Sequence, residues 1–268
     1  MAIHKALTIA GSDTSGGAGL QADLKTFQEL GVYGMTAITV IVAQNPQNNW
    51  NHDVYPLSLD VLEAQLETVL AGIGVDALKT GMLATEEVIS LVARKIDQYK
   101  VKNVVIDPVM VCKGTDEVLH PETAVAIRQL LAPRSTVITP NLFEAKQLSG
   151  IAIQSVEDMK EAAQAIFRLG ADSVLIKGGA KLGTPTAVDV FYDGHSYELL
   201  ESPRFETSFT HGAGCTTAAA ITAGLAKGLS PREAVLGAKS FITAAISQSF
   251  PLNQYVGPTW HGAHRSKQ

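Results

Sequence analysis

Residues 210–220, THGAGCTTAAA, place a cysteine between a glycine-rich turn and a run of small residues that favour helix. Gly212 and Gly214 let the backbone turn its N–H groups inward, and the helix that follows directs its positive dipole end at the same point. This pattern predicts an anion-binding site. A helix N-terminus lowers the pKa of a thiol, so Cys215 is a candidate nucleophile, general base or redox sensor. The alternative is a buried, inert small residue, because free cysteine is commonly buried.

Two further glycine turns follow apolar runs. Residues 10–23, AGSDTSGGAGLQAD, carry four glycines, and residues 176–181, IKGGAK, carry Lys177, Gly178 and Gly179. Neither contains the GxxxxGK[ST] loop of P-loop proteins or a dinucleotide-binding GxGxxG. Their exposed N–H groups and the lysine could bind a nucleotide. Without other evidence, an ordinary strand-to-helix turn and an αL turn explain them equally well.

Apolar runs bounded by glycine or proline alternate with amphipathic stretches through most of the chain, which is typical of βαβ units around a mainly parallel sheet. Residues 186–202 break this rhythm, because TAVDVFYDGHSYELLES predicts two strands joined by a turn at Asp193 and Gly194. Two long helices are expected from about Ala213 and from Pro231. The expected strands and helices are listed by residue range: strands at 5–13, 34–45, 76–82, 103–110, 135–141 and 173–179, and helices at 19–31, 59–73, 85–99, 121–131, from 142 and from 155.

No linker, charge block or internal repeat divides the 268 residues. We therefore expect residues 1–268 to form one three-layer α/β domain. Ligands of such folds collect at the carboxyl ends of the strands, where the glycine turns lead into helices.

The composition excludes several classes of protein. A formal net charge of −5 gives no general affinity for nucleic acid or for anionic membranes. No segment has the roughly 18 consecutive apolar residues of a membrane helix, and the first residues lack a signal-peptide pattern. A cytoplasmic protein is the expectation. Two cysteines without CxxC spacing and seven histidines without an HExxH pair predict free thiols and no transition-metal site.

Seven segments in order carry a family resemblance: AGSDTSGGAGLQADLKTF, VAQN, KTGM, VIDPVM, ITPNLFEA, IKGG and HGAGCT. Together they closely resemble the ribokinase-like small-molecule kinases of vitamin biosynthesis, in particular the hydroxymethylpyrimidine kinase branch and the pyridoxal and pyridoxine kinases similar to it. The resemblance runs from about Lys5 to Thr259. It implies a ribokinase-like three-layer α/β/α sandwich with a mainly parallel central sheet, ATP and Mg²⁺ as cofactors, and a homodimer.

The resemblance also implies roles for residues of the phosphate and nucleotide sites. Family members usually have aspartate where this branch has cysteine, so Cys215 would take the proton of the substrate hydroxyl, and the N–H groups of Gly212, Ala213, Gly214 and Cys215 would hold the transferring phosphoryl group. Asn141, Glu144 and Asp107 would organise Mg²⁺ and the phosphates, with Asp107 and Glu144 nearest the metal. The nucleotide loop would contain Lys177, Gly178 and Gly179, with Asp189 and Lys239 as less certain members.

For the substrate ring, the resemblance assigns Asp23, Gln44 and Met82 to the pocket, with Ser12 and Asp13 nearby. A neutral polar residue such as Gln44 suits an uncharged heterocycle. Simpler roles stay open for several members of the set: Asp107 as the cap of a loop, Glu144 in the first turn of a helix, and Met82 in the core.

The segment VCKGTDEVLH, residues 111–120, is a polar loop long enough to close over the phosphates. It resembles the pyridoxal-kinase-like members, and a low-pKa thiol adds readily to an aldehyde. We therefore expect Cys112 to act with Cys215 on pyridoxal, one near the aldehyde and the other near the hydroxyl. A loop cysteine without a role is the alternative.

The sequence thus predicts an ATP-dependent kinase for the hydroxymethyl group of pyridoxal, pyridoxine or pyridoxamine. The first alternative is the same chemistry on hydroxymethylpyrimidine or its phosphate. An alternative of another class is a non-catalytic vitamin-binding or thiol redox protein that kept the fold.

Overall fold

A nine-stranded sheet forms the centre of the computed structural model, which describes residues 3–110 and 121–267. The strand order is β3-β2-β1-β4-β5-β6-β7-β8-β9. The strands from β2 to β7 pair in parallel, and β3, β8 and β9 are antiparallel to their neighbours. The strand bounds are β1 Lys5–Asp13, β2 Tyr33–Asn45, β3 Asn51–Pro56, β4 Ala77–Thr80, β5 Val104–Ile106, β6 Val137–Ile138, β7 Val174–Gly179, β8 Ala187–Tyr192 and β9 Tyr197–Ser202.

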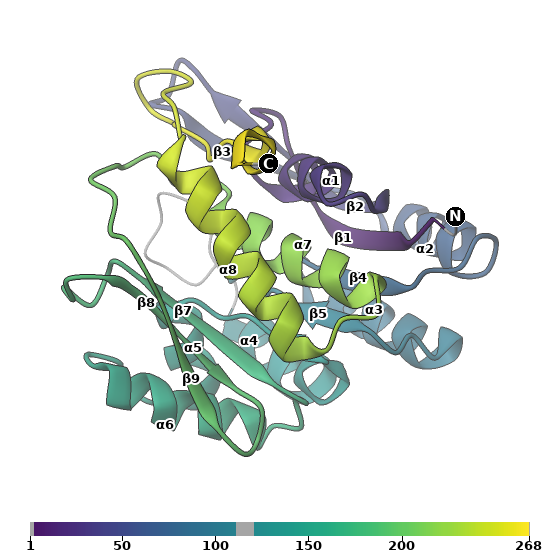
Figure 1. Cartoon of the computed structure of the whole chain (residues 1–268). Helices are drawn as coiled ribbons and strands as arrows, with labels where there is room; N and C mark the ends of the chain where they lie inside the picture. The colour runs from purple at the N-terminus through teal and green to yellow at the C-terminus, as the bar shows by residue number, and fades with distance from the viewer. Residues whose placement is uncertain (1–2, 111–120, 268) are drawn as a thin grey trace.

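Helices cover both faces of this sheet, and in Figure 1 α7 and α8 cross in front of the strands. One face packs on α1, α7 and α8, and the opposite face packs on α2 to α6. The helix bounds are α1 Gly19–Glu29, α2 Leu59–Leu70, α3 Glu86–Tyr99, α4 Pro121–Ala126 with a π turn at Ile127–Leu131, α5 Leu142–Ser149, α6 Val156–Phe167, α7 Ala213–Ala226 and α8 Pro231–Ser247. The predicted α/β/α sandwich with a mainly parallel sheet is therefore confirmed.

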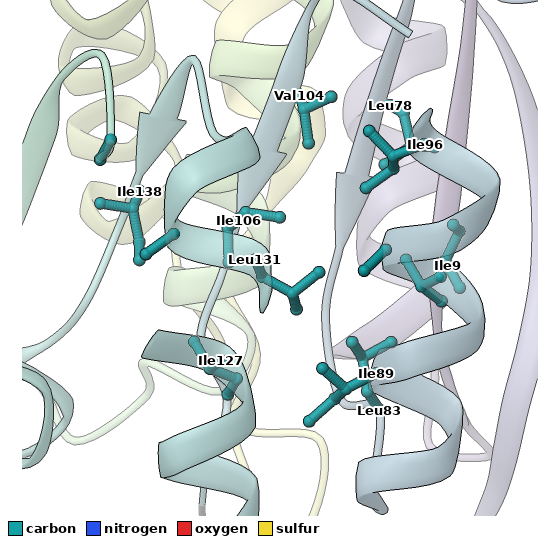
Figure 2. Close-up of a cluster of buried hydrophobic side chains, with 14 of the residues drawn as sticks. Ile9, Leu78, Leu83, Ile89, Ile96, Val104, Ile106, Ile127, Leu131 and Ile138 are labelled. Carbon is teal, nitrogen blue, oxygen red and sulfur yellow. The ribbon is translucent and has the colours of Figure 1, made fainter. Parts of the chain in front are cut away.

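The two cores explain why the central strands are apolar on both sides. Successive side chains of a strand point to opposite faces, so in β4 Leu78 enters one core and Ala77 the other. Figure 2 shows the first core, where Leu78 lies beside Ile96 of α3 and Ile106 beside Leu131. A rigid sheet of this kind fixes the positions of the loops at its carboxyl edge.

The sequence correctly predicted the hairpin of β8 and β9 but missed a strand. Asp193 accepts hydrogen bonds from the N–H groups of His195 and Ser196 at 2.8 and 2.7 Å, and Gly194 has φ +91°, so this turn joins β8 to β9. The missed strand is β3, which among the described residues pairs only with β2. An edge strand with both faces largely solvated lacks the apolar run by which buried strands are found. Within the described residues, no helix has both the length and the apolar character that spanning a membrane requires.

Candidate active site

The carboxyl ends of the parallel strands and the beginning of α7 surround two adjoining cavities. The first, which we call the β1 cavity, has a volume of about 260 Å³. Its lining residues come from the ends of β1, β2, β4, β5 and β7 and from the turn before α7. They are Ala10, Gly11, Asp13, Ala18, Gly19, Val42, Gln44, His52, Gly81, Met82, Asp107, Val109, Asn141, Glu144, Lys177 and residues 210–215.

The second, which we call the β8 cavity, has a volume of about 430 Å³ and lies over β7, β8 and α8. Its lining residues are Asn141, residues 177–181, Ala187, Asp189, residues 202–205, Thr207, Thr210, Ala213, Gly214, Thr217, Lys239, Ile242, Thr243 and Ile246. Both cavities are lined by Asn141, Lys177, Thr210, Ala213 and Gly214. A ligand in each cavity would therefore meet the other at the N-terminus of α7.

The N-terminus of α7 leaves donors available at this meeting point. Gly212 is the N-cap residue with φ +79°, and no side chain caps the helix. The amide of Ala213 donates to the carbonyl of Thr210 at 3.1 Å, whereas the hydrogen bonds of the described residues include no partner for the amides of Gly214 and Cys215. Lys177 is close, because a Cβ on Gly214 would lie 3.3 Å from its Nζ. Two free N–H groups, a helix dipole and an ammonium together suit a phosphate group.

Gly212→Ala is expected to disrupt this N-terminus. A Cβ at position 212 would lie 1.8 Å from the carbonyl oxygen of Gly17, and φ +79° is unfavourable for alanine. We expect a loss of stability of about 2 kcal/mol or more, since strain and overpacking each cost about 1–3 kcal/mol. Urea unfolding would measure the loss. Gly237→Ala is the control, because position 237 has space for a methyl group, and an equal effect of both changes would contradict the prediction.

Cys215 is half-buried in the first turn of α7, and the pKa of its thiol differs from the value expected from the sequence. Burial, followed by the charge of Asp23 and that of Asp107, raises its pKa to about 12. The ammonium of Lys79 and a hydrogen bond from the N–H of Gly19 oppose this rise without cancelling it. The expectation of a lowered pKa was therefore wrong for the ligand-free protein, because burial and two nearby carboxylates disfavour the thiolate. Cys112, the second cysteine, lies outside the described residues.

The raised pKa predicts slow alkylation of Cys215 in the free protein. With a pKa of about 12, about one thiol in 10⁴ is ionised at pH 8, against about a quarter for an exposed cysteine of pKa near 8.5. We expect alkylation by iodoacetamide at pH 8 to be at least about 100-fold slower than that of glutathione and to rise with pH up to 10. Peptide mapping separates Cys215 from Cys112. Alkylation as fast as that of glutathione would contradict the raised pKa.

Two carboxylates and a lysine face the shared wall of the cavities. Lys177 Nζ is 2.8 Å from Asp107 Oδ1. Burial disfavours the charge of Lys177, but Asp107 and Glu144 outweigh it and raise the pKa of the ammonium, so Lys177 stays charged. Glu144 forms a capping box with Asn141, with hydrogen bonds of 2.8 and 3.0 Å, and its burial raises its pKa to about 7. Glu144 thus lies in the first turn of α5, which was its simpler alternative role, and it also lines the β1 cavity.

The donor set at this wall fits Mg²⁺. Magnesium prefers oxygen ligands and is usually held by one or two carboxylates together with phosphates and water. Asp107 and Glu144 supply two carboxylates whose charges interact. Among residues 3–110 and 121–267, no group of three or more His, Cys, Asp or Glu side chains forms a metal cage, so the phosphates of a nucleotide would have to complete the coordination.

A second ion pair lies beside the loop of Lys177, Gly178 and Gly179 in the β8 cavity. Asp189 accepts from Lys239 Nζ at 2.7 Å and from the N–H of Gly179 at 3.0 Å. Gly178 lies against β8, because a Cβ there would be 2.4 Å from the carbonyl oxygen of Val188. Asp189 and Lys239 therefore lie beside the loop that the sequence assigned to the nucleotide.

Comparisons with known proteins agree on one family. The family model for phosphomethylpyrimidine kinase matches residues 13–260. The chain belongs to this family. A pyridoxine kinase of Bacillus subtilis is 63% identical over 100% of this chain and 99% of its own length. The crystal structure of an ADP complex of Bacillus subtilis pyridoxal kinase superposes with a TM-score of 0.96 at 63% identity, covering 98% of this chain and 99% of that one.

A further relative belongs to the pyrimidine branch of the family. The hydroxymethylpyrimidine/phosphomethylpyrimidine kinase of Bacillus subtilis is 45% identical over 99% of this chain and 97% of its own length. The predicted resemblance to the pyridoxal and pyridoxine kinases of this family is confirmed.

Of the five residues that the resemblance placed in or near the ring pocket, the structure puts three in the lining of the β1 cavity. Asp13, Gln44 and Met82 line the β1 cavity, and Met82 is half-buried there rather than in the core. Ser12 is not among the lining residues, and its hydroxyl accepts from Gln21 Nε2 at 2.8 Å. Asp23 is fully buried below the cavity, where its Oδ2 accepts from Lys79 Nζ at 2.9 Å and from the hydroxyl of Thr8 at 2.6 Å. Asp23 is thus a correction to the expected lining, whereas Ser12, which was expected only near the pocket, directly precedes Asp13 in β1.

Two residues of the site were missed by sequence reasoning. His211 lines the β1 cavity, and its Nε2 is 2.7 Å from Asp13 Oδ2. Lys79 is fully buried and makes the ion pair with Asp23. His211 directly precedes the glycine turn and Lys79 lies within KTGM, so both were inside the matched segments. Their partners are 198 and 56 residues away, and no local pattern indicates such pairings.

Proposed function

We propose that this chain is an ATP-dependent kinase that transfers the γ-phosphoryl group to the hydroxymethyl group of pyridoxal, pyridoxine or pyridoxamine. The observation that carries the proposal is the pair of cavities that share the N-terminus of α7. Identity of 63% to a pyridoxine kinase over the whole chain supports it. A Staphylococcus aureus pyridoxal kinase in complex with AMP-PCP and pyridoxal, 51% identical with a TM-score of 0.92, supports the same pair of ligands.

In this proposal each cavity receives one substrate. The ring of the vitamin occupies the β1 cavity between Gln44 and Met82, with its hydroxymethyl group towards Cys215. The nucleotide occupies the β8 cavity, with its phosphates along the loop of Gly178 and Gly179. Phosphoryl transfer requires mainly alignment and positive charge around the transferred oxygens. The amides of Gly214 and Cys215 and the ammonium of Lys177 supply both.

Asp107, Glu144 and Asn141 would hold Mg²⁺ beside these phosphates. The ion would supply charge neutralisation at the phosphate oxygens. Lys177 already neutralises Asp107 in the free protein, and Glu144 has a pKa of about 7, so this wall carries less negative charge before the ligands arrive than its two carboxylates suggest. That arrangement lessens repulsion of the nucleotide.

Cys215 is the proposed acceptor of the hydroxyl proton. Its thiol is almost entirely protonated near pH 7 in the free protein, so proton acceptance requires the small thiolate fraction or a lowering of the pKa by cations at the assembled site. Because the phosphoryl group is transferred through a loose transition state, the proton can leave the hydroxyl late. A base positioned beside the alcohol is then sufficient.

The test is turnover of the purified protein with MgATP, followed as ADP formation, on pyridoxal, pyridoxine and pyridoxamine separately. We expect phosphorylation at the hydroxymethyl group, identified by mass spectrometry, and no turnover without nucleotide. Stabilisation by these ligands in a thermal shift without any ADP formation would contradict the proposal and favour a non-catalytic binding protein.

Hydroxymethylpyrimidine is the second candidate substrate. The family model and the 45% identical relative favour it. The same assay with hydroxymethylpyrimidine and with its phosphate tests it. Exclusive turnover of the pyrimidine would replace pyridoxal as the substrate and leave the assignment of the two cavities unchanged.

A homodimer in the cytoplasm belongs to the same proposal. The family resemblance supports the dimer, and so do two exposed apolar side chains at the sheet edge, Ile41 and Tyr55, which face each other across β2 and β3. The need for ATP supports the cytoplasm. Sedimentation velocity would show a species of about twice 28.4 kDa, and a monomer at micromolar concentration would contradict the dimer.

A further inference from the structure

Asp13 is the centre of a hydrogen-bond network in the wall of the β1 cavity. The residue is 5% exposed and lies at the end of β1. Oδ1 accepts from Gln44 Nε2 at 2.6 Å and from the N–H of Ser15 at 2.9 Å. Oδ2 is 2.7 Å from His211 Nε2 and accepts from the N–H of Ala18 at 2.8 Å. One carboxylate thus joins the turn after β1, the end of β2 and the turn before α7.

This network decides which end of the Gln44 amide faces the cavity. An ionised carboxylate can only accept hydrogen bonds, so the NH₂ group of Gln44 must point at Asp13. Burial disfavours the ionised form of Asp13, but hydrogen bonds from His211, Ser15 and Gln44 outweigh it and hold its pKa well below the usual range. The carbonyl oxygen of Gln44 has no hydrogen-bond partner among the described residues and is the end left for a ligand.

The same network resists rearrangement when a ligand enters. A Cβ on Gly17 would lie 2.5 Å from His211 Cδ2, and one on Gly212 would lie 1.8 Å from the carbonyl oxygen of Gly17, so the two turns are in close contact. Turning the amide of Gln44 around would place two oxygens against each other at about the present 2.6 Å contact. The polarity of the Gln44 position is therefore fixed before a ligand binds.

We propose that Asp13 is a specificity-determining residue, which fixes Gln44 as a hydrogen-bond acceptor and so selects heteroaromatic alcohols that carry a hydrogen-bond donor on the ring. This inference rests on the proposed function. It accounts for both candidate substrates, because pyridoxal carries a phenolic hydroxyl and hydroxymethylpyrimidine carries an exocyclic amine. An analogue without the donor leaves the Gln44 oxygen desolvated and unpaired.

The experiment compares pyridoxine with 3-deoxypyridoxine, which lacks the phenolic hydroxyl. For the wild-type protein we expect kcat/KM to be about 10- to 100-fold higher for pyridoxine, from the usual cost of an unpaired buried polar group. In Asp13→Asn the amide at position 13 can accept or donate, so Gln44 can turn, and we expect this ratio to fall below about 3-fold, mainly through KM for pyridoxine. Gln44→Met leaves Asp13 in place and should abolish the ratio as well.

Asp193→Asn is the matched control, because Asp193 accepts backbone N–H groups in the remote β8–β9 turn and should leave the ratio unchanged. A wild-type ratio near one, or full discrimination retained in either Asp13→Asn or Gln44→Met, overturns the inference. Calorimetric binding of the two compounds to wild type and variants gives the same comparison without turnover. If the wild-type protein binds selectively but never forms ADP, the proposed function fails and the inference stands. If the pyrimidine alone reacts, the pair to compare is hydroxymethylpyrimidine and its 4-deamino analogue.

Discussion

Replacing Cys215 with alanine is expected to lower kcat for vitamin phosphorylation by about 10²–10⁴-fold, the usual contribution of a positioned general base. The side chain is half-buried in the wall of the β1 cavity, next to Gly214, which lines both cavities, so its loss removes the atom proposed to take the hydroxyl proton. KM for MgATP should change by less than about 3-fold, because the amides at the start of α7 remain. Steady-state kinetics on pyridoxal and pyridoxine would measure both constants.

Two further variants at position 215 distinguish proton acceptance from hydrogen bonding. Serine retains a hydrogen-bonding atom but ionises even less readily than the thiol. The kcat of Cys215→Ser should therefore be close to that of Cys215→Ala. Cys215→Asp introduces the residue that the resemblance to the wider ribokinase-like kinases implies at this position, and it should recover part of the lost rate. Full activity of Cys215→Ala would show that the thiol has no part in the chemistry, and full activity of Cys215→Ser would leave it only a hydrogen-bonding role.

Lys79→Met is expected to lower the free energy of unfolding by about 3–5 kcal/mol, the usual cost of breaking a buried ion pair from one side. Both side chains of the Lys79 and Asp23 pair are 0% exposed. Asp23 Oδ1 has no hydrogen-bond partner among the described residues, so within that part of the chain the change would leave the carboxylate with only the hydroxyl of Thr8. Urea unfolding would measure the loss.

The loss of stability caused by Lys79→Met should be smaller at low pH than at high pH. Burial raises the pKa of Asp23 even in the presence of Lys79, whose charge opposes the rise. Without Lys79 the folded protein should bind a proton at Asp23 at pH values where the unfolded chain does not. A carboxyl group with a raised pKa in the folded state contributes stability that is fully present below its unfolded-state pKa. This contribution is lost as the pH rises through the folded-state pKa, so the variant should be less destabilised at pH 5 than at pH 8.

Two control variants make the Lys79 prediction specific. Lys95 is also buried, but its partners Glu63 and Glu67 are 46% and 40% exposed, so Lys95→Met should cost only about 1 kcal/mol. The double change Asp23→Leu with Lys79→Met removes both charges and should recover most of the stability. A single Lys79→Met variant within about 1 kcal/mol of the wild-type protein would contradict the prediction.

The fold followed largely from local pattern. Apolar runs between glycine and proline predicted β1, β2, β4, β5, β6 and β7, and DG at residues 193–194 predicted the β8–β9 hairpin. These signals are readable because a strand covered on both faces must be apolar throughout. The edge strand β3 was missed for the same reason, since solvent covers much of it. Helix starts at Thr85, Ser155 and Ser230 have side-chain caps, which the sequence also displays.

Describing the candidate site required both the sequence and the tertiary structure. The sequence by itself determined the glycine turn and helix that present free amides at residues 214–215, because backbone conformation and the helix dipole are local properties. Only the tertiary structure decided the state of the thiol at the same position. Asp23 and Asp107 come to Cys215 from other elements, and together with burial they raise its pKa, which the helix N-terminus would otherwise lower. Charge interactions and desolvation depend on what surrounds a group in space, so the residues next to Cys215 in the sequence did not reveal them.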